Sequence, residues 1–96
     1  MARRGYVYIL ASKKDGTLYI GVTNNLSGRV YAHNIGKASV FTRRYAVNRL
    51  VWYEEHPTVP LAIQRETSLK RWKRAWKIAL IEEHNPDWKD LSARLV

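Results

Sequence analysis

The 96 residues suffice for one domain with a modest hydrophobic core, and the absence of cysteine excludes disulfides and cysteine-bound zinc, which suits a reducing cytoplasm. Lys and Arg number 17 against 8 Asp and Glu, and the resulting net charge of +9 favours an anionic partner, most often a nucleic acid, over a protein that is simply basic. No long apolar run, signal-peptide pattern or lipidation motif is present, so we expect no membrane association.

Two segments rich in Tyr, Val and Ile begin the chain, at residues 5–10 and 17–22, and a short polar stretch between them ends in Asp15-Gly16. An Asp-Gly pair flanked by such segments is typical of a β-hairpin. A two-residue turn there would pair Lys14 with Thr17. The sequence therefore predicts two antiparallel strands joined by a tight turn.

Side chains alternate between the two faces of a strand, so this pairing sorts the hairpin into an aliphatic face and a tyrosine face. The aliphatic face carries Val7, Ile9, Leu18, Ile20 and Val22, and the tyrosine face carries Tyr6, Tyr8, Leu10, Tyr19 and Gly21. We expect the first to meet the core and the second to meet another layer or a functional site, although tyrosines on a sheet are most often structural. Gly21 offers room for the close approach of a ligand, or marks a bulge.

A short helix is predicted from Leu26 to Asn34, because an asparagine at 24–25 can cap its start and Gly36 can end it. Arg29 and His33 are four residues apart in this helix and therefore share one face. If the connection from the second strand is short, that face packs near the tyrosine face. A guanidinium and an imidazole would then join the phenols.

The rest of the chain is expected to form a loop over 37–48, a strand over 49–55, a helix over 61–83 and a last short turn or helix over 87–95. The loop carries Arg43 and Arg44, and Asn85-Pro86 ends the long helix. This order, β-β-α-β-α with a short tail, predicts an α+β fold with a small antiparallel or mixed sheet. We expect one domain over residues 1–96.

One face of the long predicted helix is apolar. At about 100° per residue its members fall within one arc, namely Ala62, Leu69, Trp72, Trp76, Ala79 and Leu80. That face predicts packing against the core, for the two tryptophans as well.

Glu66 lies at the border of this face, with Lys70, Lys73 and Lys77 along the same border. A carboxylate in that position needs compensation. A pair with Lys70, worth about 0.3–0.5 kcal/mol, is one explanation, and helix periodicity alone favours it. The other explanation is a bound cation. With no cysteine and only three histidines, that cation would be an oxygen-ligated ion such as Mg²⁺ or Mn²⁺.

Together these segments resemble the GIY-YIG nuclease superfamily, and in particular its small stand-alone bacterial branch. Tyr19-Ile20-Gly21 matches the second motif of the family letter for letter, and Tyr6-Val7-Tyr8 is a relaxed form of the first. The positions that match the site of the family are Tyr8, Tyr19, Arg29, His33 and Glu66, and Asn85 matches its late asparagine loosely. The resemblance implies a three-stranded sheet flanked by helices and a metal-dependent endonuclease that hydrolyses DNA.

The resemblance also implies a role for each matching residue. Glu66 would ligate one divalent ion, and Arg29 would bind the scissile phosphate. Tyr8, Tyr19 or His33 would position or deprotonate the attacking water, which leaves the identity of the general base open. The residues expected to hold DNA by charge are Arg43, Arg44, Lys70 and Lys73.

A non-catalytic nucleic-acid-binding module that kept the fold is the alternative, with RNA as another possible target. The intact set of site residues favours the nuclease, because a protein that only binds has no need for a carboxylate facing phosphate. Members of the superfamily usually gain selectivity from an attached domain. We therefore expect weak sequence preference, or a protein partner that supplies targeting.

Overall fold

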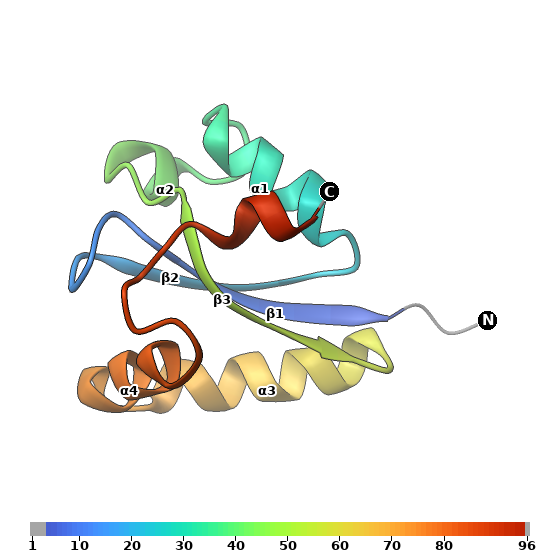
Figure 1. Ribbon diagram of the computed structural model, residues 1–96. Coiled ribbons are helices and arrows are strands. Elements are labelled where there is room, and N and C mark those ends of the chain that lie inside the picture. The colour runs from blue at the N-terminus through green and yellow to red at the C-terminus, as the bar shows by residue number, and fades with distance from the viewer. Residues whose placement is uncertain (1–3, 96) are drawn as a thin grey trace.

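A three-stranded antiparallel sheet lies in the middle of the computed structural model, which describes residues 4–95 (Figure 1). Its strands are β1 (Gly5–Ala11), β2 (Leu18–Thr23) and β3 (Arg49–His56), in the order β2-β1-β3. β1 pairs in antiparallel direction with both neighbours, and its residues from Val7 to Ala11 are all buried. The predicted α+β class and the three-stranded sheet are confirmed, and the sheet is purely antiparallel.

The turn between β1 and β2 is longer than the two residues predicted. The backbone N–H of Ser12 donates to the carbonyl of Thr17 at 3.0 Å, which leaves a four-residue loop between them. Asp15 takes a positive φ of 58° in this loop, a conformation that aspartate tolerates. Thr17 therefore lies opposite Ser12 and not Lys14. The register differs from the predicted one by two residues, and an even shift keeps every side chain on its predicted face.

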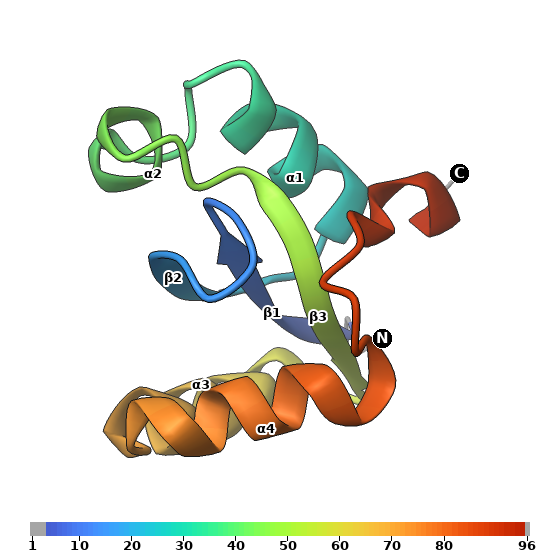
Figure 2. The same cartoon turned by 60° about the vertical axis from the view of Figure 1, so that its left-hand side comes forward.

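Helices α3 (Val59–Arg71) and α4 (Arg74–His84) form one layer against the aliphatic face of the sheet (Figures 1 and 2). The core on this side includes Val7, Ile9, Ile20, Val51, Ala62, Leu69, Ile81 and Trp88. Leu18 and Val22 pack against the same core. The aliphatic face of the hairpin thus meets the core, as its alternation predicts.

The prediction of a single helix over 61–83 is wrong, because the chain leaves helical geometry at Trp72 and Lys73, whose ψ angles are both 148°. A continuous helix of that length would measure about 35 Å at 1.5 Å per residue. The longest strand beneath it, β3, has 8 residues and spans only about 27 Å. The break lets α4 run back along α3, as Figure 2 shows, and bury Ile81 against the sheet.

The break also changes which side chains of this region face the core. Trp76, predicted to pack inside, is 55% exposed, and Ala79 is exposed as well. Trp72 and Leu80 pack partly against the core. The predicted stripe is therefore correct for α3 and wrong for two of its three members in α4, because a break in the helix resets the angle between residues on either side of it.

Helix α1 (Leu26–Asn34), helix α2 (Val40–Arg44) and the short 3₁₀ helix η1 (Leu91–Leu95) cover the tyrosine face (Figure 1). A second core lies beneath them and contains Tyr8, Leu10, Leu26, Val30, Val47, Leu50 and Leu91. Asn25 caps α1, since its Oδ1 accepts the N–H of Gly28 at 3.2 Å. Among the described residues, 4–95, no helix is both long enough and apolar enough to span a membrane.

Helix α2 corrects the prediction of a loop over 37–48. Its N-cap is Ser39, whose Oγ accepts the backbone N–H of Thr42 at 3.3 Å. Five residues make little more than one turn, which is too short for a helical period to show in the sequence. This short helix holds Phe41 and Thr42 next to β2 and α1, where they become part of the site described below.

Candidate active site

The side chain of Tyr8 extends from the central strand β1 across the neighbouring strand β2. Tyr8 lies opposite Gly21 in the register, and a Cβ atom at Gly21 would collide with the hydroxyl and ring of Tyr8. The pairing of β1 with β2 is regular at this point, without a bulge. The room that glycine leaves is thus occupied by Tyr8, whose side chain is fully buried.

Tyr8 and His33 form a buried hydrogen-bonded pair. The hydroxyl of Tyr8 lies 3.1 Å from Nε2 of His33, which comes from α1 and is only 3% exposed. The other ring nitrogen, Nδ1, lies 2.9 Å from Oγ1 of Thr42 on α2. Thr42 is buried too. No role was predicted for Thr42 from the sequence, although it lies three residues after a serine that can cap a helix.

Tyr19 on β2 completes an aromatic cluster with this pair. Its ring centroid lies 5.3 Å from that of His33 and 6.3 Å from that of Tyr8. On its other side Tyr19 stacks on Phe41 of α2, at 6.2 Å and an interplanar angle of 30°. Tyr19 is half-buried, whereas Tyr8 is closed off from solvent. Tyr19 is therefore the phenol at the open side of the cluster.

Burial and nearby charges set the protonation of the buried pair. Burial raises the pKa of Tyr8 to about 12; the neighbouring Tyr19 adds to this shift, the positive charge of Arg29 opposes it, and the Glu66 carboxylate reinforces it. Burial also lowers the pKa of His33, and the Arg29 charge lowers it further. At neutral pH Tyr8 therefore keeps its proton and His33 is uncharged. Arg29 itself is exposed on α1.

Glu66 approaches the cluster from α3, on the other side of the sheet. Its side chain is 16% exposed, and it pairs with Lys70 at 3.7 Å, the i,i+4 arrangement expected from the helix. The Glu66 carboxylate is the last of the causes that act on the pKa of Tyr8, which it raises. Among residues 4–95 there is no group of three or more His, Cys, Asp or Glu side chains that could surround a metal.

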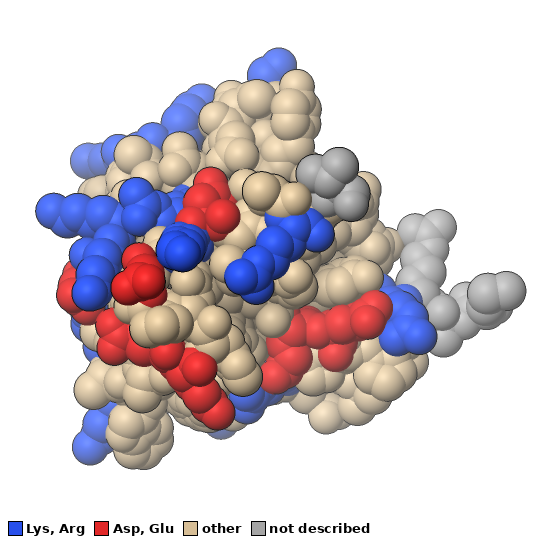
Figure 3. Space-filling view, viewed as in Figure 1, with Lys and Arg blue, Asp and Glu red and all other residues tan. Residues whose placement is uncertain are grey.

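A cleft of about 300 Å³ lies beside Tyr19. It is lined by Leu18, Tyr19, Ile20, Phe41, Lys70 and Lys77. Arg43 and Arg44 are exposed on α2, and Arg44 lies over the ring of Tyr45 at 5.7 Å. Figure 3 shows blue side chains projecting from the left of the molecule, the side on which α2 and the β1–β2 turn lie in that view. Of the predicted DNA-binding residues, Lys70 lines this cleft, whereas Arg43 lines a separate hollow with Gly36 and Ser39.

Lys73 and Asn85 have other surroundings. Lys73 lies over the ring of Trp76 at 5.7 Å, at the start of α4. Asn85 is buried beside β3, where its Nδ2 donates to the carbonyls of Val51 at 3.1 Å and Lys89 at 2.9 Å. Its Oδ1 accepts the N–H of Lys89 at 3.0 Å. These bonds hold the chain after α4 against the strand, so the structure does not join Asn85 to the tyrosine cluster.

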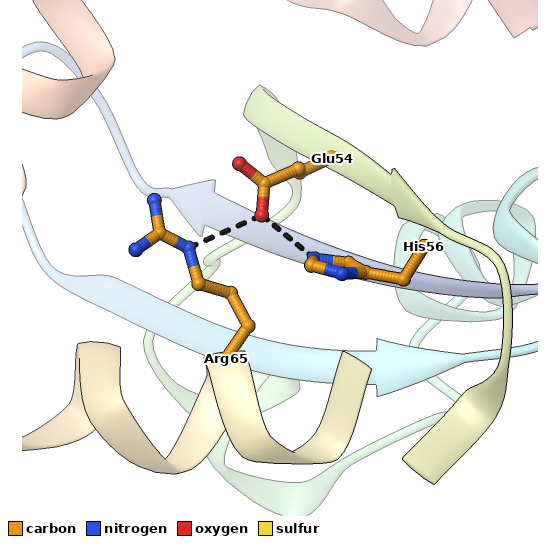
Figure 4. A network of polar contacts seen from close by, with 3 residues as sticks. All are labelled: Glu54, His56 and Arg65. Atoms are coloured by element: carbon orange, nitrogen blue, oxygen red, sulfur yellow. Dashed lines mark hydrogen bonds and ion pairs between the residues drawn. The ribbon is translucent and has the colours of Figure 1, made fainter. Parts of the chain in front are cut away.

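A second polar cluster lies at the β3 edge of the sheet (Figure 4). Oε1 of Glu54 accepts from Nε2 of His56 at 2.7 Å and from Nε of Arg65 at 3.1 Å. Glu54 and His56 come from β3, and Arg65 comes from α3. The imidazole and the guanidinium therefore both bind the Glu54 carboxylate, and the bond from Arg65 fastens α3 to the strand.

Comparison with known proteins matches residues 4–79 to the GIY-YIG catalytic domain. A UPF0213 protein of Streptococcus sanguinis is 36% identical over 83 residues, which are 86% of this chain and 94% of that protein. A UPF0213 protein of Natronomonas pharaonis is 39% identical over 83 residues, 86% of this chain and 96% of its own. The solution NMR structure of a UPF0213 protein from Bacillus halodurans has 31% identity and a TM-score of 0.56, and the match covers 91% of this chain and 92% of that one.

Proposed function

The chain belongs to the GIY-YIG family, and from that premise we propose that it is a metal-dependent endonuclease that hydrolyses phosphodiester bonds in DNA. The family supports nuclease activity, whereas the names of the UPF0213 relatives state no activity. The observation that carries the proposal is the buried Tyr8–His33 hydrogen bond, beside which the Arg29 charge opposes the rise in the pKa of Tyr8 and adds to the lowering of the pKa of His33. A module that only binds nucleic acid has no use for such a pair.

His33 is the proton acceptor in this proposal. Its lowered pKa keeps it neutral at pH 7, and its Nε2 lies at hydrogen-bond distance from Tyr8. A phenol with a pKa near 12 is a poor base by itself. Tyr8 is closed off from solvent, so in this proposal the Tyr19 ring moves aside when substrate binds and admits the attacking water to the oxygen of Tyr8. As the water forms its bond to phosphorus and the bond from phosphorus to the leaving oxygen breaks, the water proton passes to Tyr8 while the proton of Tyr8 passes to Nε2 of His33. Tyr19, at the open side, orients the water.

Arg29 binds the scissile phosphate. It is exposed on α1, and within residues 4–95 it has no carboxylate partner at ion-pair distance. A guanidinium of this kind can donate two hydrogen bonds to a phosphate and stabilise the charge that develops in the transition state. Its position also explains why its charge acts on both Tyr8 and His33.

Glu66 would hold the divalent ion that the family implies. A single carboxylate fits Mg²⁺ or Mn²⁺, because such ions commonly take one or two carboxylates, keep several waters and complete their shell with substrate phosphate. Among residues 4–95 the cation paired with Glu66 is the exposed ammonium of Lys70 at 3.7 Å, a long and weak pair that a stronger cation can replace. Bound there, the ion would neutralise charge on the phosphate and the leaving oxygen.

DNA is held by the basic groups around the cleft. Arg43 and Arg44 lie on α2, Lys70 and Lys77 line the cleft itself, and Lys73 lies next to them at the start of α4. Contacts of this kind go to phosphates and carry little sequence information. Weak sequence preference is therefore expected for the isolated chain.

The test is incubation of the purified protein with linear, nicked and branched DNA, with Mg²⁺, with Mn²⁺ and with a chelator. The proposal expects cleavage of at least one substrate that needs the metal and that is lost in the His33→Gln variant. Salt-sensitive binding with no cleavage of any substrate would support the binding module instead. Cleavage that persists in His33→Gln would show that another group is the base.

A further inference from the structure

Thr42 is a buried polar residue of α2, 1% exposed, and the proposed mechanism does not use it. Its Oγ1 lies 2.9 Å from Nδ1 of His33 and 3.2 Å from the carbonyl oxygen of Ser39. A threonine hydroxyl has one proton to donate and lone pairs to accept with. Where that proton goes decides which nitrogen of His33 carries the ring proton.

Two hydroxyl protons compete for the acceptors around His33, those of Thr42 and Tyr8. Neutral imidazole has one protonated nitrogen and one acceptor nitrogen. If the acceptor were Nδ1, Thr42 would donate to it, and Nε2–H would donate to Tyr8. The Tyr8 hydroxyl is fully buried, and within residues 4–95 its hydrogen-bonding neighbours are His33 and Arg29, of which the guanidinium can only donate. Its proton would then have no acceptor, which costs about 1–3 kcal/mol for a buried group.

The opposite arrangement satisfies every proton. Thr42 donates to the carbonyl of Ser39, His33 donates from Nδ1 to Oγ1 of Thr42, and Tyr8 donates to Nε2 of His33. We propose that Thr42 is a positioning residue that keeps the ring proton of His33 on Nδ1 and so leaves Nε2 free to accept the proton of Tyr8.

Helix α2 positions one part of the site that is open to solvent and one part that is buried. Thr42 points to His33, and its neighbour Phe41 stacks on Tyr19. Ser39 supplies the carbonyl that receives the Thr42 proton and also caps the helix with its side chain. α2 is therefore the element that sets the orientation of the histidine. Its consequence for catalysis rests on the proposed function, whereas the position of the proton does not.

The direct test is long-range ¹H–¹⁵N correlation NMR of the imidazole rings in ¹⁵N-labelled protein at neutral pH. His33→Gln identifies the signals of His33. The proposal expects the wild-type ring of His33 to carry its proton on Nδ1. In Thr42→Val, which has the same shape without the hydroxyl, the population protonated on Nε2 should grow. Thr42→Ser, which keeps the hydroxyl, should return the wild-type spectrum.

The kinetic test compares the same variants. Thr42→Val should lower kcat at least about tenfold, since a positioned base typically contributes 10²–10⁴-fold, with little change in KM. Thr42→Ser should recover most of the rate. Thr67→Val, the same change at an exposed position of α3, should leave both constants unaltered.

Two results would overturn the proposal. One is a wild-type His33 protonated on Nε2, and the other is a folded Thr42→Val with wild-type kcat and an unchanged tautomer. If Thr42→Val does not fold, the wild-type and Thr42→Ser spectra still decide the tautomer. A wild-type protein that cleaves no DNA contradicts the proposed function, and the spectrum would still decide the role of Thr42.

Discussion

The two edges of the sheet carry the same kinds of side chain in opposite states. At the β3 edge, Glu54 binds both His56 and Arg65, so the carboxylate there is already occupied by two partners (Figure 4). At the β2 edge, the imidazole of His33 is bonded to two hydroxyl groups, and the ion-pair partner of Glu66 among residues 4–95 is an exposed lysine at 3.7 Å. Charges that are not paired with each other are available to a phosphate and a cation.

Two consecutive residues of α3 produce this difference. Arg65 bonds to Glu54 of β3, whereas Glu66 pairs with Lys70, which lines the cleft formed by β2 residues. Neighbours on a helix lie about 100° apart, so one helix serves both edges. The role of an Arg or Glu in this chain therefore depends on which edge of the sheet its side chain reaches. The comparison of the two edges also supplies matched controls, because the glutamate, the arginine and the histidine of the open edge each have a counterpart in the closed cluster.

The largest expected effect is the difference in cleavage between variants of the two glutamates, Glu66 and Glu54. Glu66→Gln should abolish metal-dependent cleavage and leave DNA binding intact or tighter, because it removes the charge that a cation needs while keeping the shape. The loss of stability should be small, since its pair with Lys70 is worth about 0.3–0.5 kcal/mol. Measurements of cleavage, DNA affinity and Tm on one preparation test this.

Glu54→Gln is the control for that variant. It should cleave normally and lose on the order of 1 kcal/mol of stability, because two hydrogen bonds to Glu54 weaken. If the two variants lose cleavage equally, the distinction between the open and the closed edge is wrong.

The next effect separates the two arginines. Arg29→Ala should lower the cleavage rate by about 10²-fold or more and change Tm little, because an exposed guanidinium contributes to the transition state and not to packing. Arg65→Ala should do the reverse, since Arg65 bonds to Glu54 and lies over the ring of Trp72 at 5.3 Å. Normal cleavage by Arg29→Ala would place Arg29 outside the site.

A smaller effect concerns the pH dependence of stability at the open edge. The pKa of His33 is lower in the folded protein than its ordinary value, so in the window between the two the unfolded chain binds more protons. His33 should therefore make the free energy of unfolding fall as pH drops from about 6.5 towards that lowered pKa. Urea titrations across this range should show the slope in the wild type and a weaker one in His33→Gln. Equal slopes would contradict the burial of an uncharged histidine.

The smallest effect concerns the basic surface. Changing Arg43 and Arg44 together to Ala should weaken DNA binding a few-fold, with the slope of log affinity against log salt reduced by roughly one to two. A variant with Lys89 and Arg94 changed to Ala removes the same charge on the β3 side, where Arg94 lines a hollow with Tyr53. Its salt slope should stay near that of the wild type. Equal losses in both variants would mean that net charge, and not the open edge, holds DNA.

The sequence by itself determined what depends on short-range patterns. Alternation sorted the hairpin residues onto the correct faces, and Asn25 caps α1 at the predicted place. The spacing of Arg29 and His33 placed them on one helix face, and the family motifs pointed to the fold. These predictions follow from the periodicity of side chains along a strand or a helix, which is two or 3.6 residues, or from a side chain that bonds to its neighbours in the chain. Such features depend only on residues close together in the sequence.

Only the tertiary structure decided the features that depend on distant segments. The break at Trp72 follows from the limited length of the sheet that α3 and α4 cover, and α2 is too short to have a period of its own. The need for glycine at position 21 comes from the Tyr8 ring crossing it, and the role of Thr42 comes from a histidine nine residues away. A sequence pattern reports which face a residue is on. What lies opposite that face is set by packing between segments far apart in the chain.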